Sequence, residues 1–485
     1  MSKDRFVDSA ERATRWIAAY RGRVADLPVL PRVEPGEIAA SLPEDPPEDP
    51  EDLETVLRDL DAVLVPGLTH WNHPGFFAYF CSSTTDAGVL AEFVAAELNQ
   101  NAMLWRTSPA GTELEQRMVD WVRRFVHLPE AYRGLILDTA SSSSFTALLA
   151  ARERAVPGVR RLGLAGRDDI GPCTIYVSEE AHSSLDTAAL AAGFGLEQVR
   201  RIRVDARLRM IPGALEGAIE EDRTAGRIPV MVCATIGTTS TTSVDPVPEI
   251  AAVCEREGLW LHVDAAYAGP AASLPEKRAE FEGWDRADSI VVNPHKWLST
   301  PIDCSVLFYR DDDAMRRPLA LTPVYLSSAE DGANLMDIGL SLGRRFRALK
   351  LWFQFRLEGA ESIRRRLRSH IASADALAGW IEADPRFELA APHPFSLVVF
   401  RAVPPPGTDP ENSDDWNRTL LEAVNRRGPV FLSHTTVRSR YAIRLAVGSA
   451  RSTEAAVRQA WRLLSEEYDR LAAAEPIRSG AGGPE

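Results

Sequence analysis

The stretch Ser289-Ile-Val-Val-Asn-Pro-His-Lys-Trp297 joins a short apolar run to a polar turn that contains a lysine. The β-branched residues of this run favour a fully buried strand. A lysine just past a buried strand is expected to lose part of its hydration, which lowers the pKa of its amine. Lys296 is therefore a candidate for Schiff-base formation with a carbonyl group. The ordinary alternative is a solvated surface lysine.

Similar short apolar runs recur through the middle of the chain, with helical patterns between several of them. One such helix, with an apolar stripe from Leu114 to Phe125, is expected to begin with a capping box at Thr112–Glu115. Alternating strands and helices predict a mostly parallel sheet with helices on both faces, and ligands of such sheets bind beyond the carboxyl ends of the strands. The other expected strands are Leu135–Leu137, Thr174–Val177, Ile202–Val204, Val230–Cys233, Trp260–Val263 and Ser305–Phe308.

The two ends of the chain have different patterns from the middle. Near the start, an amphipathic helix around residues 6–20 and a second helix, Leu53–Leu64, flank a connector rich in Pro and acidic residues. Such an arm cannot bury its own apolar faces, so we expect it to pack on something else. The last part has strand-like Ser396–Phe400 and Ala442–Val447 with helices near Trp416–Asn425 and Thr453–Leu471, which predicts a small α+β domain. We divide the chain into an N-terminal helical arm (1–87), a large α/β domain (88–370), a small C-terminal α+β domain (371–474) and a disordered tail (475–485).

The composition is that of an ordinary globular protein. The 485 residues, of which 45% are hydrophobic and 26% charged, suffice for two or three subdomains. The net charge of −14 argues against nucleic acid or an anionic membrane as a partner. The N-terminus does not resemble a signal peptide and no run approaches the roughly 20 apolar residues of a membrane span, so we expect a cytoplasmic location. The five cysteines show no metal-binding spacing and are expected to be buried free thiols, with no metal site.

Three further polar loops follow expected strands. In Asp138-Thr-Ala-Ser-Ser-Ser-Ser144, small hydroxyl residues precede a helix, where they bind a phosphate or simply cap the helix. His182 follows the second strand, where it stacks on a flat cofactor or is an ordinary surface histidine. Asp264 ends an apolar strand and needs a cationic partner, which is either a protonated ring nitrogen or a nearby arginine.

Taken in chain order, these loops supply the groups that pyridoxal 5′-phosphate (PLP) requires. They are a phosphate-binding helix start, an imidazole, a carboxylate, and a lysine 32 positions after the carboxylate (296 − 264). The phosphate anchors PLP, the imidazole covers one face of the ring, the carboxylate keeps the pyridine nitrogen protonated, and the amine holds the aldehyde. No GxGxxG, Walker, HExxH or GxSxG motif competes with this interpretation. The sequence therefore predicts a PLP enzyme.

Longer motifs carry a resemblance to a known family. They are THWNHPGFFAYF (69–80), DTASSSSFTALLAARE (138–153), ATIGTTSTTSVDP (234–246), HVDAAYAGPA (262–271), NPHKWL (293–298) and LGRRFRALKLWF (342–353). The chain resembles, nearly end to end, the group II PLP-dependent decarboxylases, the aromatic-L-amino-acid decarboxylase family. The resemblance implies a fold-type I PLP enzyme, and an obligate homodimer whose N-terminal arm wraps the partner subunit. It also implies an active site at the dimer interface, with a small-molecule amino acid as the substrate.

The resemblance also implies a role for individual residues. Lys296 is the Schiff-base lysine, Asp264 pairs with the pyridine nitrogen, and His182 stacks on the ring, so these three are the expected catalytic residues. The residues implied to bind the cofactor are Thr139, Ala140, Ser141, His182, Thr235, Asp264, Asn293, His295 and Lys296. Those implied to bind the substrate are Trp71, Tyr79, Phe80, Cys81 and His295, with Asn101 and Met103 reaching in from the partner chain.

The reaction that the resemblance implies is decarboxylation of an L-amino acid, through an external aldimine and a quinonoid, to an amine and CO2. Trp71, Tyr79 and Phe80 favour an aromatic substrate, although ordinary packing also explains such residues. In the family, a tyrosine on a mobile loop helps to protonate Cα. Residues 326–341 contain no tyrosine: Tyr325 lies just before them, and the positions that match the tyrosine are Leu335 or Ile338. Restoring a tyrosine at either position is expected to raise the share of amine.

Three alternatives stay open. Without the tyrosine, either water, His182 or another residue protonates Cα and the amine still forms, or oxygen reacts instead of a proton and gives an aldehyde, ammonia and hydrogen peroxide. A catalytically silent structural homologue is disfavoured, because it has no reason to bury an aspartate and a lysine. A carbon–carbon lyase acting on a phosphorylated substrate would need a second phosphate-binding pocket with basic residues. Asn101 is also able to hydrogen-bond to a polar side chain of the substrate. Cys81 and Met103 have a small and a flexible side chain, so the pocket wall is able to adapt to substrates of different shape.

Overall fold

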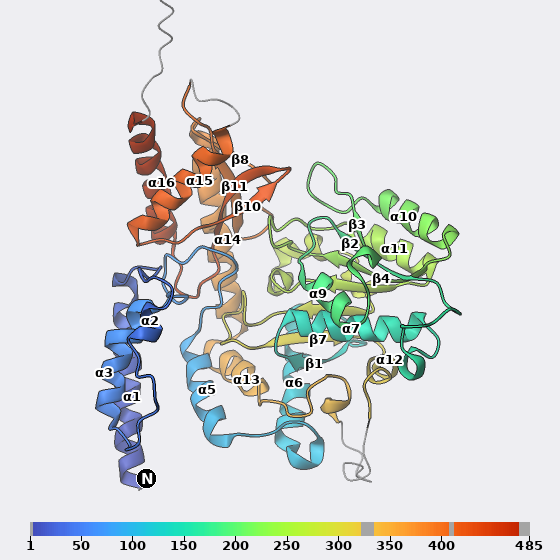
Figure 1. Cartoon of the computed structure of the whole chain (residues 1–485), viewed down its shortest axis with the longest axis horizontal. Coiled ribbons are helices and arrows are strands. Elements are labelled where there is room, and N and C mark those ends of the chain that lie inside the picture. Colours follow the sequence, from blue (N-terminus) through green and yellow to red (C-terminus); the bar gives the residue numbers. More distant parts are fainter. Residues whose placement is uncertain (1–2, 322–333, 407–411, 475–485) are drawn as a thin grey trace, which may run out of the picture.

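A seven-stranded sheet forms the centre of the protein (Figure 1). The computed structural model describes residues 3–321, 334–406 and 412–474. The strand order is β1-β7-β6-β5-β4-β2-β3, and β7 alone runs against its neighbours, so the predicted, mostly parallel sheet is confirmed. The strands are β1 (Arg133–Leu137), β2 (Cys173–Ser178), β3 (Val199–Ile202), β4 (Ile228–Thr235), β5 (Trp260–Asp264), β6 (Ser289–Val292) and β7 (Ser305–Tyr309).

Helices cover both faces of this sheet because its strands are apolar on both faces. Along β2, for example, Ile175 and Val177 join one buried cluster while Tyr176 joins the other. Strands buried on both sides are what a parallel sheet with crossover helices requires. One face packs against α7 (Ala140–Ala155), α9 (Ser184–Ala191) and α12 (Asp312–Arg316); the other packs against α6 (Pro109–Phe125), α10 (Pro212–Thr224), α11 (Val247–Glu257) and α14 (Ala360–Ala383).

A second, four-stranded antiparallel sheet in the order β10-β11-β9-β8 lies near the C-terminus. It packs with α15 and α16 around its own buried cluster. The elements are β8 (Phe387–Leu389), β9 (Leu397–Ala402), α15 (Ser413–Arg427), β10 (Ser433–Val437), β11 (Arg440–Ala446) and α16 (Glu454–Ala474). Neither β8, which is very short, nor β10, whose sequence is polar, was expected. A polar edge strand of this kind is specified by its partner rather than by its own pattern.

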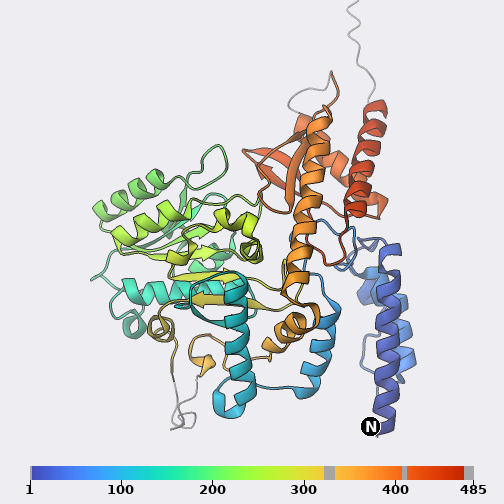
Figure 2. The same ribbon diagram turned by 180° about the vertical axis from the view of Figure 1, so that it is seen from behind.

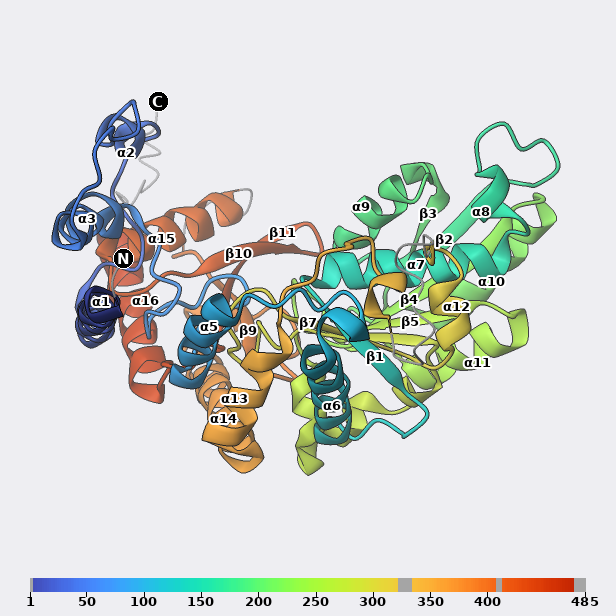
Figure 3. The same ribbon diagram turned by 90° about the horizontal axis from the view of Figure 1, so that it is seen from below.

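The N-terminal helices stand apart from the large sheet (Figures 2 and 3). They lie at the end of the molecule that carries α16, and the Arg451 guanidinium donates to the backbone oxygen of Arg21 at 3.0 Å. Their bounds, with the helix that follows them, are α1 (Lys3–Arg23), α2 (Glu37–Ala40), α3 (Leu53–Asp59), a π-helical turn (Leu60–Leu64), α4 (Val65–Gly67) and α5 (Asp86–Leu98). The domain boundaries of the sequence analysis stay predictions.

Two local expectations are wrong. The helix α6 begins at Pro109, with Ser108 in the N-cap position, so Thr112 lies inside the helix and caps nothing. Proline is favoured in the first turn because its missing N–H is not needed there. Glu115 instead accepts a hydrogen bond from the N–H of Ile136 at 2.8 Å. The third strand ends at Ile202, before the expected range ends, and the chain beyond it makes only an isolated bridge.

Two general features complete the fold. All five cysteines are buried and unpaired. Among the described residues, no helix combines the length and the apolar character that a bilayer crossing requires.

Candidate active site

The four polar loops of the sequence analysis meet at one cavity of about 210 Å³. The loops follow β1, β2, β5 and β6, and β4 ends at the cavity as well, so the site lies at the carboxyl edge of the parallel strands. All nine residues predicted to bind a cofactor line it: Thr139, Ala140, Ser141, His182, Thr235, Asp264, Asn293, His295 and Lys296.

Lys296 borders this cavity directly after β6. Its Nζ atom lies 5.6 Å from the centre of the Phe80 ring. Burial lowers the pKa of the Lys296 amine, and the negative charge of Asp264 acts in the opposite direction. A lowered pKa increases the fraction of neutral amine, which is the form that attacks a carbonyl carbon. The lysine therefore has the environment that Schiff-base chemistry needs.

Asp264 ends β5 and is 8% exposed. Its Oδ1 atom accepts a hydrogen bond from the N–H of Ala266 at 3.0 Å. In the part of the chain that the structure describes, no arginine or lysine lies within ion-pair distance of this carboxylate. The alternative of a structural salt bridge is therefore not realised there. A protonated ring nitrogen would supply the cationic partner that a buried carboxylate requires.

His182 lines the cavity between β2 and α9, with part of its ring exposed. The N–H of Ser184 donates to its Nδ1 atom at 3.0 Å, so the neutral ring carries its proton on Nε2. Burial lowers the pKa of His182, and the charge of Lys296 lowers it further, while Asp264 and Asp186 raise it. The imidazole is thus a neutral, oriented ring at neutral pH, suited to stacking on a flat ligand.

The first turn of α7 forms one end of the cavity. Thr139 caps the helix by accepting from the N–H of Ser142 at 3.4 Å. Ser143 and Ser144 are buried and bond to Ser305 and His262, at 2.8 and 3.1 Å. Ser143 and Ser144 therefore serve the packing of the helix, while Ala140 and Ser141, at its start, line the cavity. A helix start of this kind binds a phosphate group.

Unsatisfied polar atoms in the wall show that the site is built for a polar ligand. Thr235 Oγ1 is buried without a hydrogen-bond partner among the described residues. One end of the Asn293 amide contacts His295 Nε2 at 3.3 Å, and its other end is buried without a partner there. His295 accepts from the N–H of Cys304 at 3.0 Å, and burial lowers its pKa to about 4. Such groups cost free energy until a ligand satisfies them, and PLP fits this set of residues.

Five lining residues were not predicted: Ser184, Gly237, Thr239, Ala266 and Tyr267. Tyr267 stacks between Phe80 and Trp297, with ring centres 3.7 and 4.8 Å away, and its hydroxyl bonds to Ser396 at 2.6 Å. This aromatic stack closes one side of the cavity. Most of the five lie inside motifs already quoted, but nothing in the sequence shows which side of a loop faces the cavity.

The residues predicted to bind substrate divide into two groups. Phe80 and His295 line the cavity, whereas Trp71, Tyr79 and Cys81 do not. Trp71 stacks on Phe76 at 4.4 Å and on Tyr79 at 6.2 Å, and both Trp71 and Tyr79 are partly exposed. Cys81 is buried, its thiol donates to the backbone oxygen of Trp71 at 3.2 Å, and burial raises its pKa to about 12.

The positions predicted for the proton-donating tyrosine lie in the core of the chain. Leu335 is 4% exposed and Ile338 is 0% exposed. Leu335 lines the larger cavity described below and Ile338 joins the buried cluster that includes α7, so neither lines the Lys296 cavity. The effect of a tyrosine at either position stays a prediction. The preceding segment of the expected loop, with Tyr325, lies outside the described residues. Asn101 and Met103 do not line the cavity; they lie on the turn before α6.

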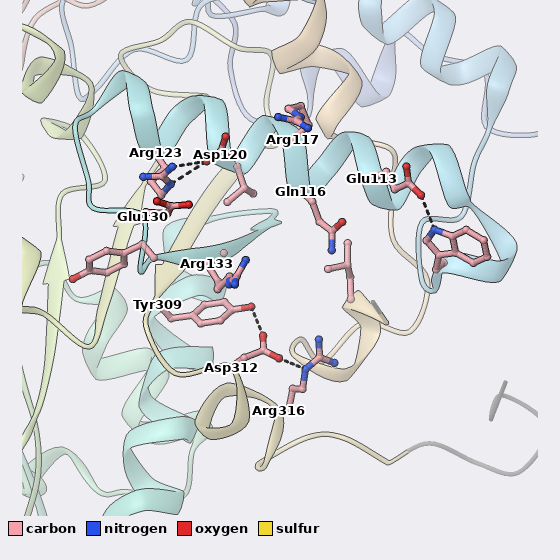
Figure 4. Close-up of a pocket in the computed structure, with 15 residues that line it drawn as sticks. Glu113, Gln116, Arg117, Asp120, Arg123, Glu130, Arg133, Tyr309, Asp312 and Arg316 are labelled. Carbon is pink, nitrogen blue, oxygen red and sulfur yellow. Dashed lines mark hydrogen bonds and ion pairs between the residues drawn. The ribbon is translucent and has the colours of Figure 1, made fainter. Parts of the chain in front are cut away.

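A larger cavity, of about 740 Å³, lies between α6 and the edge of the sheet (Figure 4). It contains none of the residues predicted to bind cofactor or substrate, but Leu335, one of the two positions matched to the proton-donating tyrosine, lines it. Three of its four carboxylates already have donors within the cavity wall: Asp120 binds Arg123, Asp312 binds Arg316, and Glu113 binds the Trp105 indole. Its lining contains no lysine, so it offers no second site for Schiff-base chemistry.

The comparisons with known proteins agree with this geometry. Residues 35–403 match the family model described as the pyridoxal-dependent decarboxylase conserved domain. Phenylacetaldehyde synthase of Arabidopsis thaliana is 38% identical over 94% of this chain and 94% of its own length. Tyrosine decarboxylase 2 of Narcissus pseudonarcissus is 37% identical over 96% of this chain and 94% of its own.

Solved structures of similar proteins superpose on nearly the whole of this chain. Oryza sativa TDC with PLP and tryptamine superposes with a TM-score of 0.93, at 35% identity over 97% of this chain and 99% of that one. Rhodiola rosea 4-hydroxyphenylacetaldehyde synthase superposes with a TM-score of 0.90, at 33% identity and the same coverage of both chains.

Proposed function

Because this chain belongs to the pyridoxal-dependent decarboxylase family, we propose that it converts an aromatic L-amino acid to the corresponding amine and carbon dioxide in the Lys296 cavity. The observation that carries this proposal is the convergence of Lys296, Asp264 and the start of α7 on one cavity. PLP, when bound there, supplies the electron sink that stabilises the charge left at Cα when carbon dioxide departs.

Several residues of the cavity have a defined task in this reaction. Lys296 would hold the cofactor through its side-chain amine. Asp264 keeps a proton at the ring nitrogen, because a buried carboxylate favours a cation beside it. The first N–H groups of α7 anchor the phosphate. His182 would cover one face of the cofactor ring, and the stacked rings of Phe80 and Tyr267 would help to exclude water.

The aromatic substrate class rests on two observations. Phe80 lines the cavity, and Trp71 and Tyr79 form a partly exposed aromatic pair close to it in the sequence. Similar proteins are described as tyrosine and tryptophan decarboxylases. We expect kcat/KM for tyrosine, dopa, tryptophan or phenylalanine to exceed that for glutamate by at least about 100-fold. Amine formation by the PLP-loaded protein, measured by mass spectrometry, tests this; faster turnover of glutamate would refute the aromatic class.

We also propose a homodimer, with the N-terminal helices packed on the partner subunit. The support is an exposed apolar surface on α1 and α5, of a kind that marks an interface: Phe6, Val7, Ile17, Leu90, Phe93, Val94 and Leu98. The wild-type protein should sediment at twice its chain mass of 53.3 kDa, and Phe93→Lys should shift it toward the monomer. Sedimentation of the wild type at the chain mass would contradict the dimer. A cytoplasmic location, which the buried free cysteines support, is tested by cell fractionation.

A second candidate function is decarboxylation with oxidation of the amine carbon. The observation in its favour is that Arabidopsis thaliana phenylacetaldehyde synthase and the Rhodiola rosea enzyme resemble this chain as closely as the decarboxylases do. In that reaction the amino acid, oxygen and water yield the aldehyde, carbon dioxide, ammonia and hydrogen peroxide. The two functions differ in oxygen consumption and peroxide, which can be measured on the same samples as the amine.

A further inference from the structure

Lys350, on α13 (Ala348–Glu358), is a buried lysine that does not line the Lys296 cavity. Its side chain is 2% exposed, and its Nζ atom lies 2.7 Å from Glu92 Oε1 on α5. The same ammonium group donates to the backbone oxygens of Pro301 at 3.1 Å and Asp303 at 2.8 Å. Lys350 therefore fixes two carbonyl groups of the loop that joins β6 to β7.

One of these carbonyl groups shares a peptide with a hydrogen-bond donor to the cavity. The peptide that joins Asp303 to Cys304 carries the Asp303 carbonyl on one side and the Cys304 N–H on the other. This N–H donates to Nδ1 of His295, which lines the cavity, at 3.0 Å. A positive charge on the carbonyl side polarises the peptide and strengthens its N–H as a donor. Lys350 thus acts on His295 through a single peptide group.

The hydrogen bond at Nδ1 decides which nitrogen of His295 carries the proton. Burial and the charges of Lys296 and Lys350 lower the pKa of His295 to about 4, so the ring is neutral near pH 7. A neutral ring that accepts at Nδ1 carries its proton on Nε2. The Asn293 amide contacts this Nε2 atom at 3.3 Å. Because two N–H groups repel each other, the end of the amide that faces His295 is its oxygen.

The other end of the Asn293 amide is therefore its NH2 group. Asn293 is 1% exposed and lines the cavity, and this end of its amide is buried without a hydrogen-bond partner among the described residues. A buried donor without a partner costs free energy, which an anionic acceptor in the cavity would recover. The start of α7 favours an anion in the same cavity.

We propose that Lys350 is a positioning residue that fixes the proton of His295 on Nε2 and so turns the NH2 group of Asn293 toward the phosphate group of the cofactor. This rests on the proposed function, in which PLP occupies the Lys296 cavity. Without the Lys350 amine, both tautomers of His295 become accessible, and the Asn293 amide is free to turn its oxygen toward the phosphate. The affinity for the phosphate group should then fall, although Lys350 does not touch it.

The test compares PLP with pyridoxal, which lacks the phosphate group. The PLP-depleted full-length protein is titrated with each, and the visible band of the lysine-bound cofactor gives the Kd. In Lys350→Met, the Kd for PLP should rise about ten-fold, as when a hydrogen bond to a charged group is lost, while that for pyridoxal changes less than about two-fold. Equal changes for both, or no change, would overturn the inference. Arg347 still binds the Asp303 carboxylate at 2.8 Å, so this variant should fold.

Glu92→Gln is the matched control for Lys350→Met. It removes the charge of the partner in the same ion pair, but leaves the two bonds from Lys350 to backbone carbonyls in place. The ratio of the two Kd values should stay that of the wild type. A change in this ratio as large as in Lys350→Met would assign the effect to the ion pair and refute the positioning role.

Asn293→Asp tests the orientation of the amide without changing Lys350. It keeps the size of the side chain but replaces the NH2 group by an oxygen, which repels a phosphate. The Kd for PLP should rise at least about 100-fold, with that for pyridoxal nearly unchanged, and adding Lys350→Met should then change it less than about two-fold. An unchanged Kd for PLP in Asn293→Asp would refute the orientation. If the wild type gives no visible band with PLP, the proposed function fails and the inference with it; where the band forms, only the inference is at stake.

Discussion

Lys296→Ala is expected to abolish decarboxylation, with kcat lowered at least about 10⁴-fold, as when the central group of a catalytic unit is removed. The structure gives the reason, since Lys296 borders the cavity beside Asp264, the α7 start and His182. Without its amine, the cofactor cannot be held covalently, and the visible absorption band of lysine-bound PLP should disappear.

Lys277→Ala is the matched control for this prediction. The Lys277 amine donates to the backbone oxygen of Pro394 at 2.6 Å, outside the cavity. This variant should keep both the visible band and the activity. If Lys296→Ala kept the band while Lys277→Ala lost it, the assignment of the cofactor lysine would be wrong.

Tyr325→Phe is expected to lower the ratio of amine to aldehyde by about 100-fold, the lower end of what a general acid contributes. In the family that the chain resembles, a tyrosine on a loop helps to protonate Cα, and the two positions that match it here are occupied by Leu335 and Ile338. Tyr325, which lies outside the described residues, is the tyrosine that remains between residues 325 and 341. Without its proton, oxygen reacts at Cα and peroxide accumulates.

Amine, aldehyde and peroxide measured in the same samples check this prediction. Tyr441→Phe serves as the control, because Tyr441 is 8% exposed and lies on β11 of the small sheet. An unchanged product ratio in Tyr325→Phe would show that another group protonates Cα. If the wild type already yields aldehyde and peroxide, the second candidate function replaces the first.

The sequence predicted the cavity well because its residues follow strands whose patterns are local. Short apolar runs set β4, β5 and β6, and parallel strands bring their carboxyl ends to one edge whatever the connections are. His182, Asp264 and Lys296 each follow such a run and therefore meet there. The role predicted for each of these three residues follows from the chemistry of its side chain and not from the fold.

The errors arose where long-range contacts decide the structure. Glu115 looked like the last residue of a capping box, but it serves as the partner of Arg344, 229 positions away. Similarly, β10 is a polar strand that exists because it pairs with β11.

The most direct test of the central claim is the fate of the carboxyl carbon. PLP-loaded wild-type protein would be incubated with tyrosine labelled with ¹³C at its carboxyl group, and labelled carbon dioxide and tyramine would be measured together. The account predicts one molecule of labelled carbon dioxide for each amine formed, and neither product from Lys296→Ala. Retention of the label in unchanged or transaminated tyrosine, while the visible band of lysine-bound PLP is present, would contradict it.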